Sequence, residues 1–270
     1  MGYVDVLYKF AWVAMVGIMI ASSLMIVGPP YIPTDNDDTL NVEYSAINGS
    51  FDIDFRMGDI EGYERNTFRE YSAILTSNFF YTPHDTYVNQ VYGFMQPYFE
   101  DKPDYVKAHY LLKFVQNNID YRYDREVHGA MDYIQYPAET LLYKTGDCED
   151  VAYLLYTLYR IAGLDAVLIH GDNHMSVGVY AEGLEGEYVT YLFSSRPYYI
   201  AEPTSTYNIG HDPITTPQYA FKAEIPPFAT FVQWLIVLII PIMFCVQVRV
   251  MRESRRTYAE APLIHEEACQ

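Results

Sequence analysis

Two apolar runs divide the chain and restrict its fold more than any other feature. Phe10–Val27 and Phe228–Val248 contain no charged residue. At about 1.5 Å rise per residue, helices of about 18 and 21 residues are long enough to cross a ~30 Å hydrocarbon layer. The alternatives are a cleaved signal peptide for the first run and a buried core helix for the second. We expect two membrane-spanning helices with a single large segment, residues 29–227, between them.

The charges beside these runs predict an orientation. Four arginines follow the second run directly, and Lys9 precedes the first, whereas the inner flanks carry no excess of positive charge. By the positive-inside rule, both termini face the cytoplasm and residues 29–227 lie outside. We therefore expect a protein of the cell membrane with two spans and an extracytoplasmic domain.

The extracytoplasmic segment is strongly acidic. Residues 29–227 contain 30 Asp or Glu and 12 Lys or Arg, which accounts for the whole net charge of -18. Binding to nucleic acid requires Lys and Arg to displace counterions from phosphates, so this charge argues against a nucleic-acid partner. It suits solubility and divalent cations instead.

Cysteine usage singles out one thiol. Cys245 lies in the second apolar run and Cys269 in the tail, so Cys148 is the only cysteine between the runs and has no disulfide partner there. An unpaired thiol in an exterior compartment is either buried and inert or present for its chemistry.

Hydrophobic periodicity predicts the elements around this thiol. Alternation in residues 39–55 predicts two strands with a turn at Asn48–Ser50. Helical spacing predicts helices at 85–99, 104–119, from Pro137 onward, and from Cys148 to Ala162, where Gly163 ends the last one. Four strands are then expected at 166–170, 174–181, 188–193 and 198–201.

Three residues in this order have the chemistry of a thiol nucleophile. Cys148 opens a helix, where free N–H groups and the helix dipole stabilise a thiolate. His174 begins a strand and could accept the thiol proton, and Glu202 closes another strand and could orient the imidazole. Singly, such a cysteine is more often a small buried apolar residue, and such a histidine a solvated one. The order helix Cys, strand His, strand carboxylate is much rarer by chance.

Several motifs resemble the transglutaminase-like superfamily, including its membrane-associated archaeal and bacterial members and the bacterial transglutaminase-like cysteine proteinases. The motifs are Tyr136-Pro-Ala-Glu-Thr-Leu-Leu, Gly146-Asp-Cys-Glu-Asp, Gly163-Leu-Asp-Ala-Val, His174-Met-Ser-Val-Gly-Val and Glu202-Pro-Thr, within about residues 104–209. The resemblance implies a papain-like α+β core in which the helix bearing Cys148 packs on an antiparallel sheet. It further implies that Cys148 is the nucleophile, His174 the general base and Glu202 the orienting acid. Most of the superfamily has Asp at the third position, so Asp212 is the alternative.

These expectations define five segments: an N-terminal anchor (1–30), an extracytoplasmic extension (31–103), a transglutaminase-like catalytic core (104–226), a second transmembrane helix (227–250) and a cytoplasmic tail (251–270). The implied chemistry is acyl transfer on amide or isopeptide bonds of surface or envelope polypeptides. We favour hydrolysis over crosslinking because no lid that would exclude water is evident. A crosslinking enzyme and a non-catalytic binding or assembly module that keeps the fold are the alternatives. The Cys148 N–H would form part of the oxyanion hole, with Gln135, Tyr136 or Asn117 as the second donor.

The acids beside the thiol conflict with its role as a nucleophile. Asp147, Glu149 and Asp150 flank Cys148, and negative neighbours raise the pKa of a thiol. Either they turn away and cap the helix, or a cation neutralises them. Some related proteinases bind calcium beside this motif, and carboxylate oxygens suit that ion. We expect no required cofactor, with calcium as the candidate ligand of these three residues.

Overall fold

The computed structural model describes residues 33–65, 79–192, 194–211, 216–223 and 249. The predicted spans Phe10–Val27 and Phe228–Val248, and the alternative carboxylate Asp212, lie outside these residues. Among the described helices, none has both the length and the apolar character needed to cross a membrane.

The described part alternates short strands with helices before a run of consecutive strands. In chain order the elements are β1 (Thr39–Ala46), β2 (Gly49–Arg56), α2 (Met57–Glu64), α4 (Thr86–Met95), the 3-10 helix η2 (Gln96–Tyr98), α5 (Asp104–Asn118), β3 (Asp120–Tyr121), α6 (Asp124–Val127), α7 (Pro137–Tyr143), β4 (Thr145–Gly146), α8 (Cys148–Ile161), β5 (Asp165–Gly171), β6 (His174–Tyr180), β7 (Tyr188–Tyr191), β8 (Ser194–Ala201) and β9 (Pro217–Phe221).

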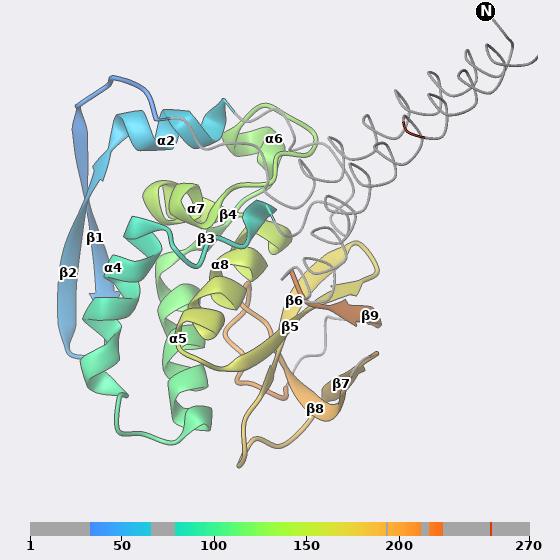
Figure 1. Ribbon diagram of the computed structural model, residues 1–270. Helices are drawn as coiled ribbons and strands as arrows, with labels where there is room; N and C mark the ends of the chain where they lie inside the picture. Colours follow the sequence, from blue (N-terminus) through green and yellow to red (C-terminus); the bar gives the residue numbers. More distant parts are fainter. Residues whose placement is uncertain (1–32, 66–78, 193, 212–215, 224–248, 250–270) are drawn as a thin grey trace, which may run out of the picture. The chain divides into compact units, whose positions relative to one another are not determined.

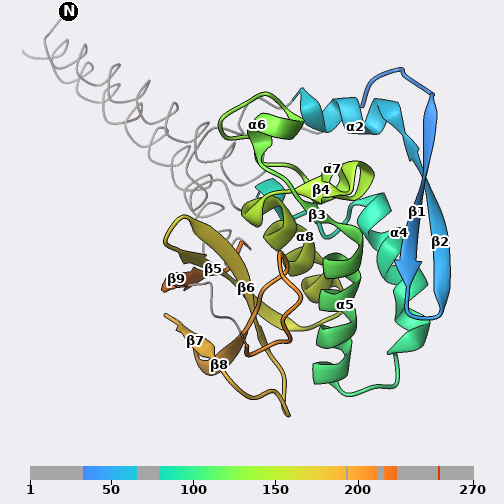
Figure 2. The same cartoon turned by 180° about the vertical axis from the view of Figure 1, so that it is seen from behind.

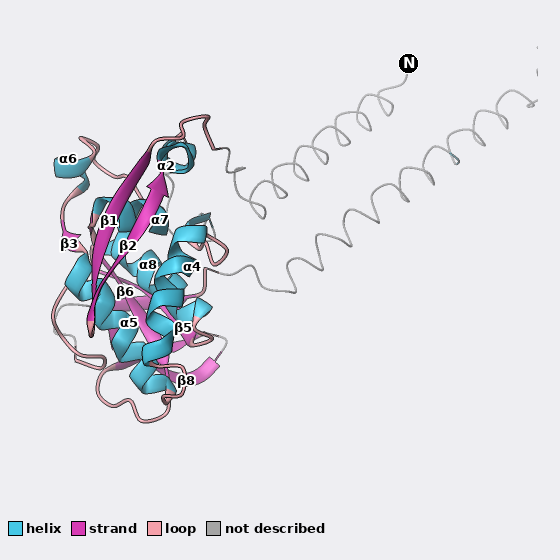
Figure 3. Ribbon diagram, turned by 90° about the vertical axis from the view of Figure 1, so that its left-hand side faces the viewer, coloured by secondary structure: helices cyan, strands magenta, loops and turns pink. Residues whose placement is uncertain are grey.

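These elements form three layers. The hairpin β1–β2 packs on α4 and α5, and α8 packs on β5 and β6 of the larger sheet (Figures 1 and 2). Seen from the hairpin side, β1 and β2 lie in front of the helices, with β5, β6 and β8 behind them (Figure 3). The helices therefore bury apolar side chains on two sides.

The larger sheet has the strand order β7-β8-β6-β5-β9, and every neighbouring pair is antiparallel. This confirms an α+β fold in which the helix bearing Cys148 packs on an antiparallel sheet. The sequence did not predict β9. Within the part of the chain that the structure describes, this edge strand pairs only with β5. It begins at Pro217, a residue that strands accept at an edge because it has no N–H to donate.

One apolar core joins the residues before and after position 104. Tyr44 on β1 is fully buried, and its hydroxyl donates to the Leu141 carbonyl at the end of α7, 2.7 Å away. Asn118, the last residue of α5, accepts from the Ser45 N–H at 2.7 Å and donates to the Ser45 carbonyl at 2.9 Å. The hairpin is thus tied to the helices by hydrogen bonds as well as by apolar contact.

Candidate active site

Local sequence places the thiol at a helix N-terminus. α8 begins at Cys148, as predicted, and ends before Gly163, whose φ of +78° lies in the left-handed region that favours glycine. Almost all of α8 is buried, since it lies between the other helices and the sheet. Cys148 itself is 8% exposed and belongs to the buried core.

His174 and Glu202 are brought together by the pairing of β6 with β8. Val177 on β6 is opposite Ala201 on β8, so Glu202, the next residue, lies near the start of β6. The His174 Nε2 atom is 2.7 Å from Glu202 Oε2. Glu202 is 1% exposed, and a buried carboxylate with this partner holds the ring in one orientation. Because Nε2–H donates to the carboxylate, Nδ1 carries the lone pair that can accept a proton.

The thiol lies against the start of the same strand. The backbone N–H of Met175, the residue after His174, hydrogen-bonds Cys148 and acts to lower the pKa of its thiol. The structure therefore brings Cys148 next to the His174–Met175 segment, and Glu202 contacts the imidazole of His174. These are the three residues that the sequence singled out.

The acids do not all turn away from the sulfur. Glu149 Oε2 lies 3.1 Å from Cys148 Sγ and accepts a hydrogen bond from the thiol. Burial raises the pKa of the Cys148 thiol well above its ordinary value; the Glu149 carboxylate adds to this, and Asp147 adds less. Of the two alternatives for these acids, turning away to cap the helix does not hold for Glu149, whose carboxylate contacts the sulfur of the preceding residue.

Asp150 does cap the helix. It is fully buried, and its Oδ2 accepts from the Asp147 N–H at 3.2 Å while its Oδ1 accepts from the Gln135 N–H at 2.7 Å. The glycine of the motif makes this possible, because a Cβ at Gly146 would lie 2.7 Å from the Asp150 Cβ. Thus Gly146 and Asp150 shape the turn that presents Cys148.

The donors of Gln135, one candidate for the oxyanion hole, are directed elsewhere. Its backbone N–H binds Asp150, and its side-chain nitrogen donates to the Thr145 carbonyl at 3.2 Å. The sequence analysis missed a residue that interacts electrostatically with Cys148. Tyr121 on β3 pairs with Gly146 on β4; burial raises the pKa of its phenol, and the charge of Cys148 is the next cause.

Asp124 is a second residue that the sequence analysis missed. Single oxygens of Asp124, Asp147 and Asp150 lie within 4.8 Å of one another, and Asp124, Asp132 and Glu149 form an overlapping group. Burial, followed by the charges of Asp150 and Glu149, raises the pKa of Asp147 to about 10, and burial raises that of Asp124 to about 6. Asp147 Oδ1 is buried and makes no hydrogen bond within the described residues. This crowding of carboxylates is typical of a site that takes up a cation.

A buried thiol at a helix N-terminus, next to a histidine held by a carboxylate, defines the cysteine-histidine-acid class of site. Residues 95–189 match the model of the transglutaminase-like superfamily. The match supports that superfamily for this part of the chain and includes Cys148 and His174, but it ends before Glu202.

Two solved structures align with the fold. Legionella pneumophila LapG aligns with a TM-score of 0.37 and 19% identity, covering 57% of this chain and 79% of that chain. A candidate protease from Parabacteroides distasonis aligns with a TM-score of 0.34 and 15% identity, covering 66% of this chain and 42% of its own. At these TM-scores neither alignment carries an argument about activity. No curated protein matches the sequence.

Proposed function

We propose that this protein is a thiol hydrolase of the transglutaminase-like type, a cysteine peptidase or amidase that cleaves amide or isopeptide bonds. The observation that carries the proposal is the 2.7 Å contact between His174 Nε2 and Glu202 Oε2, with Cys148 bound to the N–H of the residue after His174. His174 contacts Glu202 directly, and Cys148 contacts the residue after His174, so the acid and the base lie beside the thiol in the chain of groups that proton transfer requires.

The proposed reaction begins with transfer of the Cys148 proton to His174 Nδ1. The sulfur forms a bond to the substrate carbonyl carbon, and the oxyanion is stabilised by the Cys148 N–H. The C–N bond then breaks, and the amine leaves with the proton from the imidazolium, giving a thioester. Water hydrolyses the thioester, returns the proton through His174 and releases the acid. Throughout, Glu202 stabilises the charged imidazole and fixes its orientation.

The location and substrate are also proposals. We infer from the apolar runs and the arginines after the second one that the domain is anchored by two spans and lies outside the cell. A thiol peptidase in this position would act on polypeptides of the surface or the envelope. The membrane-associated archaeal or bacterial type of the superfamily is part of this proposal.

Calcium is proposed as a bound ion beside the nucleophile. Asp124, Asp147 and Asp150 would hold it, together with Glu149 from the overlapping group. Asp147 Oδ1, which has no hydrogen-bond partner within the described residues, and the raised pKa values of Asp124 and Asp147 support a site that would take up a cation. A bound cation would neutralise the carboxylates and favour the thiolate of the neighbouring cysteine.

One observation favours the alternative of a non-catalytic binding module. The thiol donates to Glu149, and its pKa is raised, so the neutral thiol is the stable form in this arrangement. A crosslinking transglutaminase uses the same three residues and differs only in the acceptor of the acyl group, so the site does not favour it over hydrolysis.

An electrophilic probe separates the enzyme from the binding module. Iodoacetamide would be applied to the full-length chain at neutral pH with calcium, and labelling would be followed on the peptide that contains Cys148, because the chain has two further cysteines, Cys245 and Cys269. We expect rapid labelling that collapses in His174→Ala. Equal, slow labelling of both proteins would refute an enzymatic role.

A further inference from the structure

The loop that begins with Glu202 is held by side chains of α5. Gln116 Nε2 donates to the Glu202 carbonyl at 2.9 Å and to the Tyr207 carbonyl at 2.9 Å. Lys113 Nζ donates to the Thr206 carbonyl at 2.9 Å and approaches the Tyr207 carbonyl at 3.5 Å. Both ends of the loop, residues 202–207, are therefore fixed to one helix, more than 80 residues away in the chain.

The lysine also determines which way the glutamine amide faces. Lys113 Nζ donates to Gln116 Oε1 at 2.8 Å. An ammonium group can only donate, so the Gln116 oxygen must face it and the NH₂ group must face the two carbonyls. Burial lowers the pKa of Lys113, as expected for an amine that has exchanged part of its water for these acceptors.

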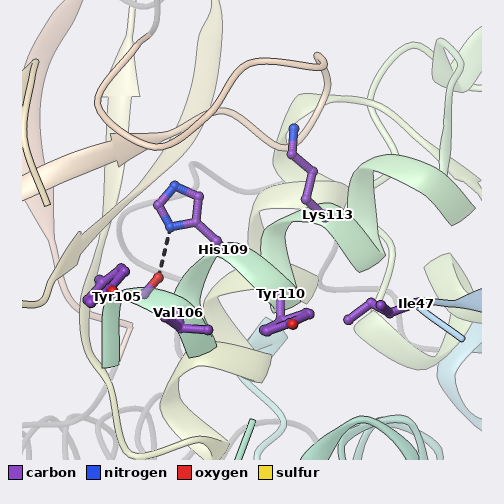
Figure 4. A pocket seen from close by; sticks show the side chains of 6 residues that line it. All are labelled: Ile47, Tyr105, Val106, His109, Tyr110 and Lys113. Atoms are coloured by element: carbon purple, nitrogen blue, oxygen red, sulfur yellow. Dashed lines mark hydrogen bonds between the residues drawn. The ribbon is translucent and has the colours of Figure 1, made fainter. Parts of the chain in front are cut away.

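Figure 4 shows the direction of Lys113 on α5. The Lys113 and His109 side chains extend to the same side of the helix, away from Ile47 and Tyr110. The His109 ring bonds back to the Tyr105 carbonyl of its own helix, at 2.8 Å. Lys113 instead reaches the loop as well as Gln116 on its own helix, so it links the loop to α5.

The position of the loop determines the position of the carboxylate. Thr204, two residues along the loop, donates to Glu202 Oε1 from its N–H at 2.9 Å and also from its hydroxyl. These bonds set the side-chain rotamer, and they leave Oε2 against His174. Because Gln116 fixes the backbone of Glu202 and the far end of the same loop, a shift at Gln116 is transmitted to the imidazole.

We propose that Gln116, oriented by Lys113, is a positioning residue that holds the Glu202 carboxylate on His174 and so keeps Cys148 reactive. The inference rests on the proposed function, since it concerns the same three catalytic groups. Gln116 touches no reacting atom. It acts through Glu202, and its removal is expected to reduce the reactivity of the thiol without removing any of the three groups.

Labelling of Cys148 by iodoacetamide in the full-length chain, with calcium present, tests this role. Gln116→Glu keeps the size of the side chain but replaces the NH₂ donors by an acceptor that faces two carbonyls. We expect labelling to slow by about 10- to 100-fold, the usual cost of losing a group that orients a reactive residue. Lys113→Met should slow labelling less, because Gln116 remains. Lys107→Met is the matched control, since its amine pairs with Asp104 on the same helix and does not reach the loop.

A double variant distinguishes positioning from general damage to the fold. If Gln116 acts through Glu202, Gln116→Glu/Glu202→Gln should label as slowly as Glu202→Gln alone. Two results would overturn the positioning role alone. One is a double variant whose loss in labelling rate equals the product of the two single losses. The other is a Gln116→Glu rate equal to that of the control while His174→Ala and Glu202→Gln label slowly. A His174→Ala rate equal to the unmodified rate would overturn the proposed function and this inference together. A thermal melt of each variant confirms that folded proteins are compared.

Discussion

Glu149→Gln should make Cys148 more reactive, although it alters the motif by which the site is recognised. The substitution removes the negative charge that lies 3.1 Å from the sulfur and accepts the thiol hydrogen bond. Both effects favour the neutral thiol, so their removal lowers the pKa of Cys148. Gln has nearly the same shape as Glu, and the packing of the first turn of α8 should be retained.

The size of the effect follows from Coulomb's law. Two unit charges 3.1 Å apart repel each other by about 1.3 kcal/mol at the dielectric constant of water, and by about 5 kcal/mol at an effective constant of 20. Since Glu149 is partly exposed, water screens its charge, and the lower figure of about 1.3 kcal/mol applies. It corresponds to about a tenfold change in the ratio of thiolate to thiol. A thiolate of lower pKa is also a weaker nucleophile, so the net gain in alkylation rate is about threefold at the least.

The assay is the rate of iodoacetamide labelling of the Cys148 peptide at several pH values. A chelator is present throughout, so that no cation is bound by the neighbouring carboxylates. Glu126→Gln is the matched control, because this acid is exposed on α6 and lies opposite Arg122, at 3.6 Å. We expect faster labelling and an earlier rise with pH in Glu149→Gln alone. Labelling that is unchanged or slower would refute the view that Glu149 suppresses the thiolate.

Three further predictions concern the acids and the core. Addition of calcium should accelerate labelling of the thiol over that in chelator, and Asp124→Asn should lose this acceleration; identical rates with and without calcium would exclude a cation that affects the thiol. Burial acts to raise the pKa of Asp165, but the hydrogen bond and charge of Lys222, with the hydrogen bonds of Tyr198 and Arg196, together outweigh it, and the net shift is downward. The contribution of this carboxylate to stability is therefore present above its unfolded pKa of 3.8 and lost as the pH falls through the lower folded value. In urea, Asp165→Asn should be less stable than the unmodified protein at pH 7, by about 1 kcal/mol, and the difference should shrink below pH 4; a constant difference would contradict this sign. Tyr44→Phe should lower the free energy of unfolding by about 1–3 kcal/mol, because the buried Leu141 carbonyl loses its donor, and the same urea titrations would measure it.

The sequence could predict those parts of the site that local pattern determines. Helical periodicity ended by Gly163 placed Cys148 at the start of α8, and strand alternation placed His174 at the start of β6. Glu202 followed from the end of β8 before Pro203. In each case the signal lies within a few residues of the group it positions. The pairing of β6 with β8 and the packing of α8 on β6 then bring the three together.

What the sequence could not show depends on contacts between distant segments. Gln116 is 86 residues from the Glu202 carbonyl that it binds, and no spacing rule connects a helix side chain to that loop. Asp124 approaches Asp147 only because the segment after β3 folds back over the turn before α8. The direction of Glu149 was likewise beyond the sequence, since a first-turn acid can cap the helix or reach the sulfur with the same backbone.

Comparison of the energies at Cys148 shows which group controls the thiol. A helix N-terminus stabilises a nearby anion by about 0.3–1 kcal/mol, and a hydrogen bond to a charged group contributes about 1.5–3 kcal/mol. The α8 dipole and the Met175 N–H together contribute about 1.8–4 kcal/mol, which is comparable to the ~1.3–5 kcal/mol by which Glu149 opposes the thiolate, and burial and Asp147 oppose it further. The His174–Glu202 pair can accept the proton only when the groups that stabilise the thiolate and those that oppose it nearly cancel. Neutralising one carboxylate changes the free energy of the thiolate relative to the thiol by at least about 1.3 kcal/mol. The charge state of the acids therefore decides whether a correctly placed base can act.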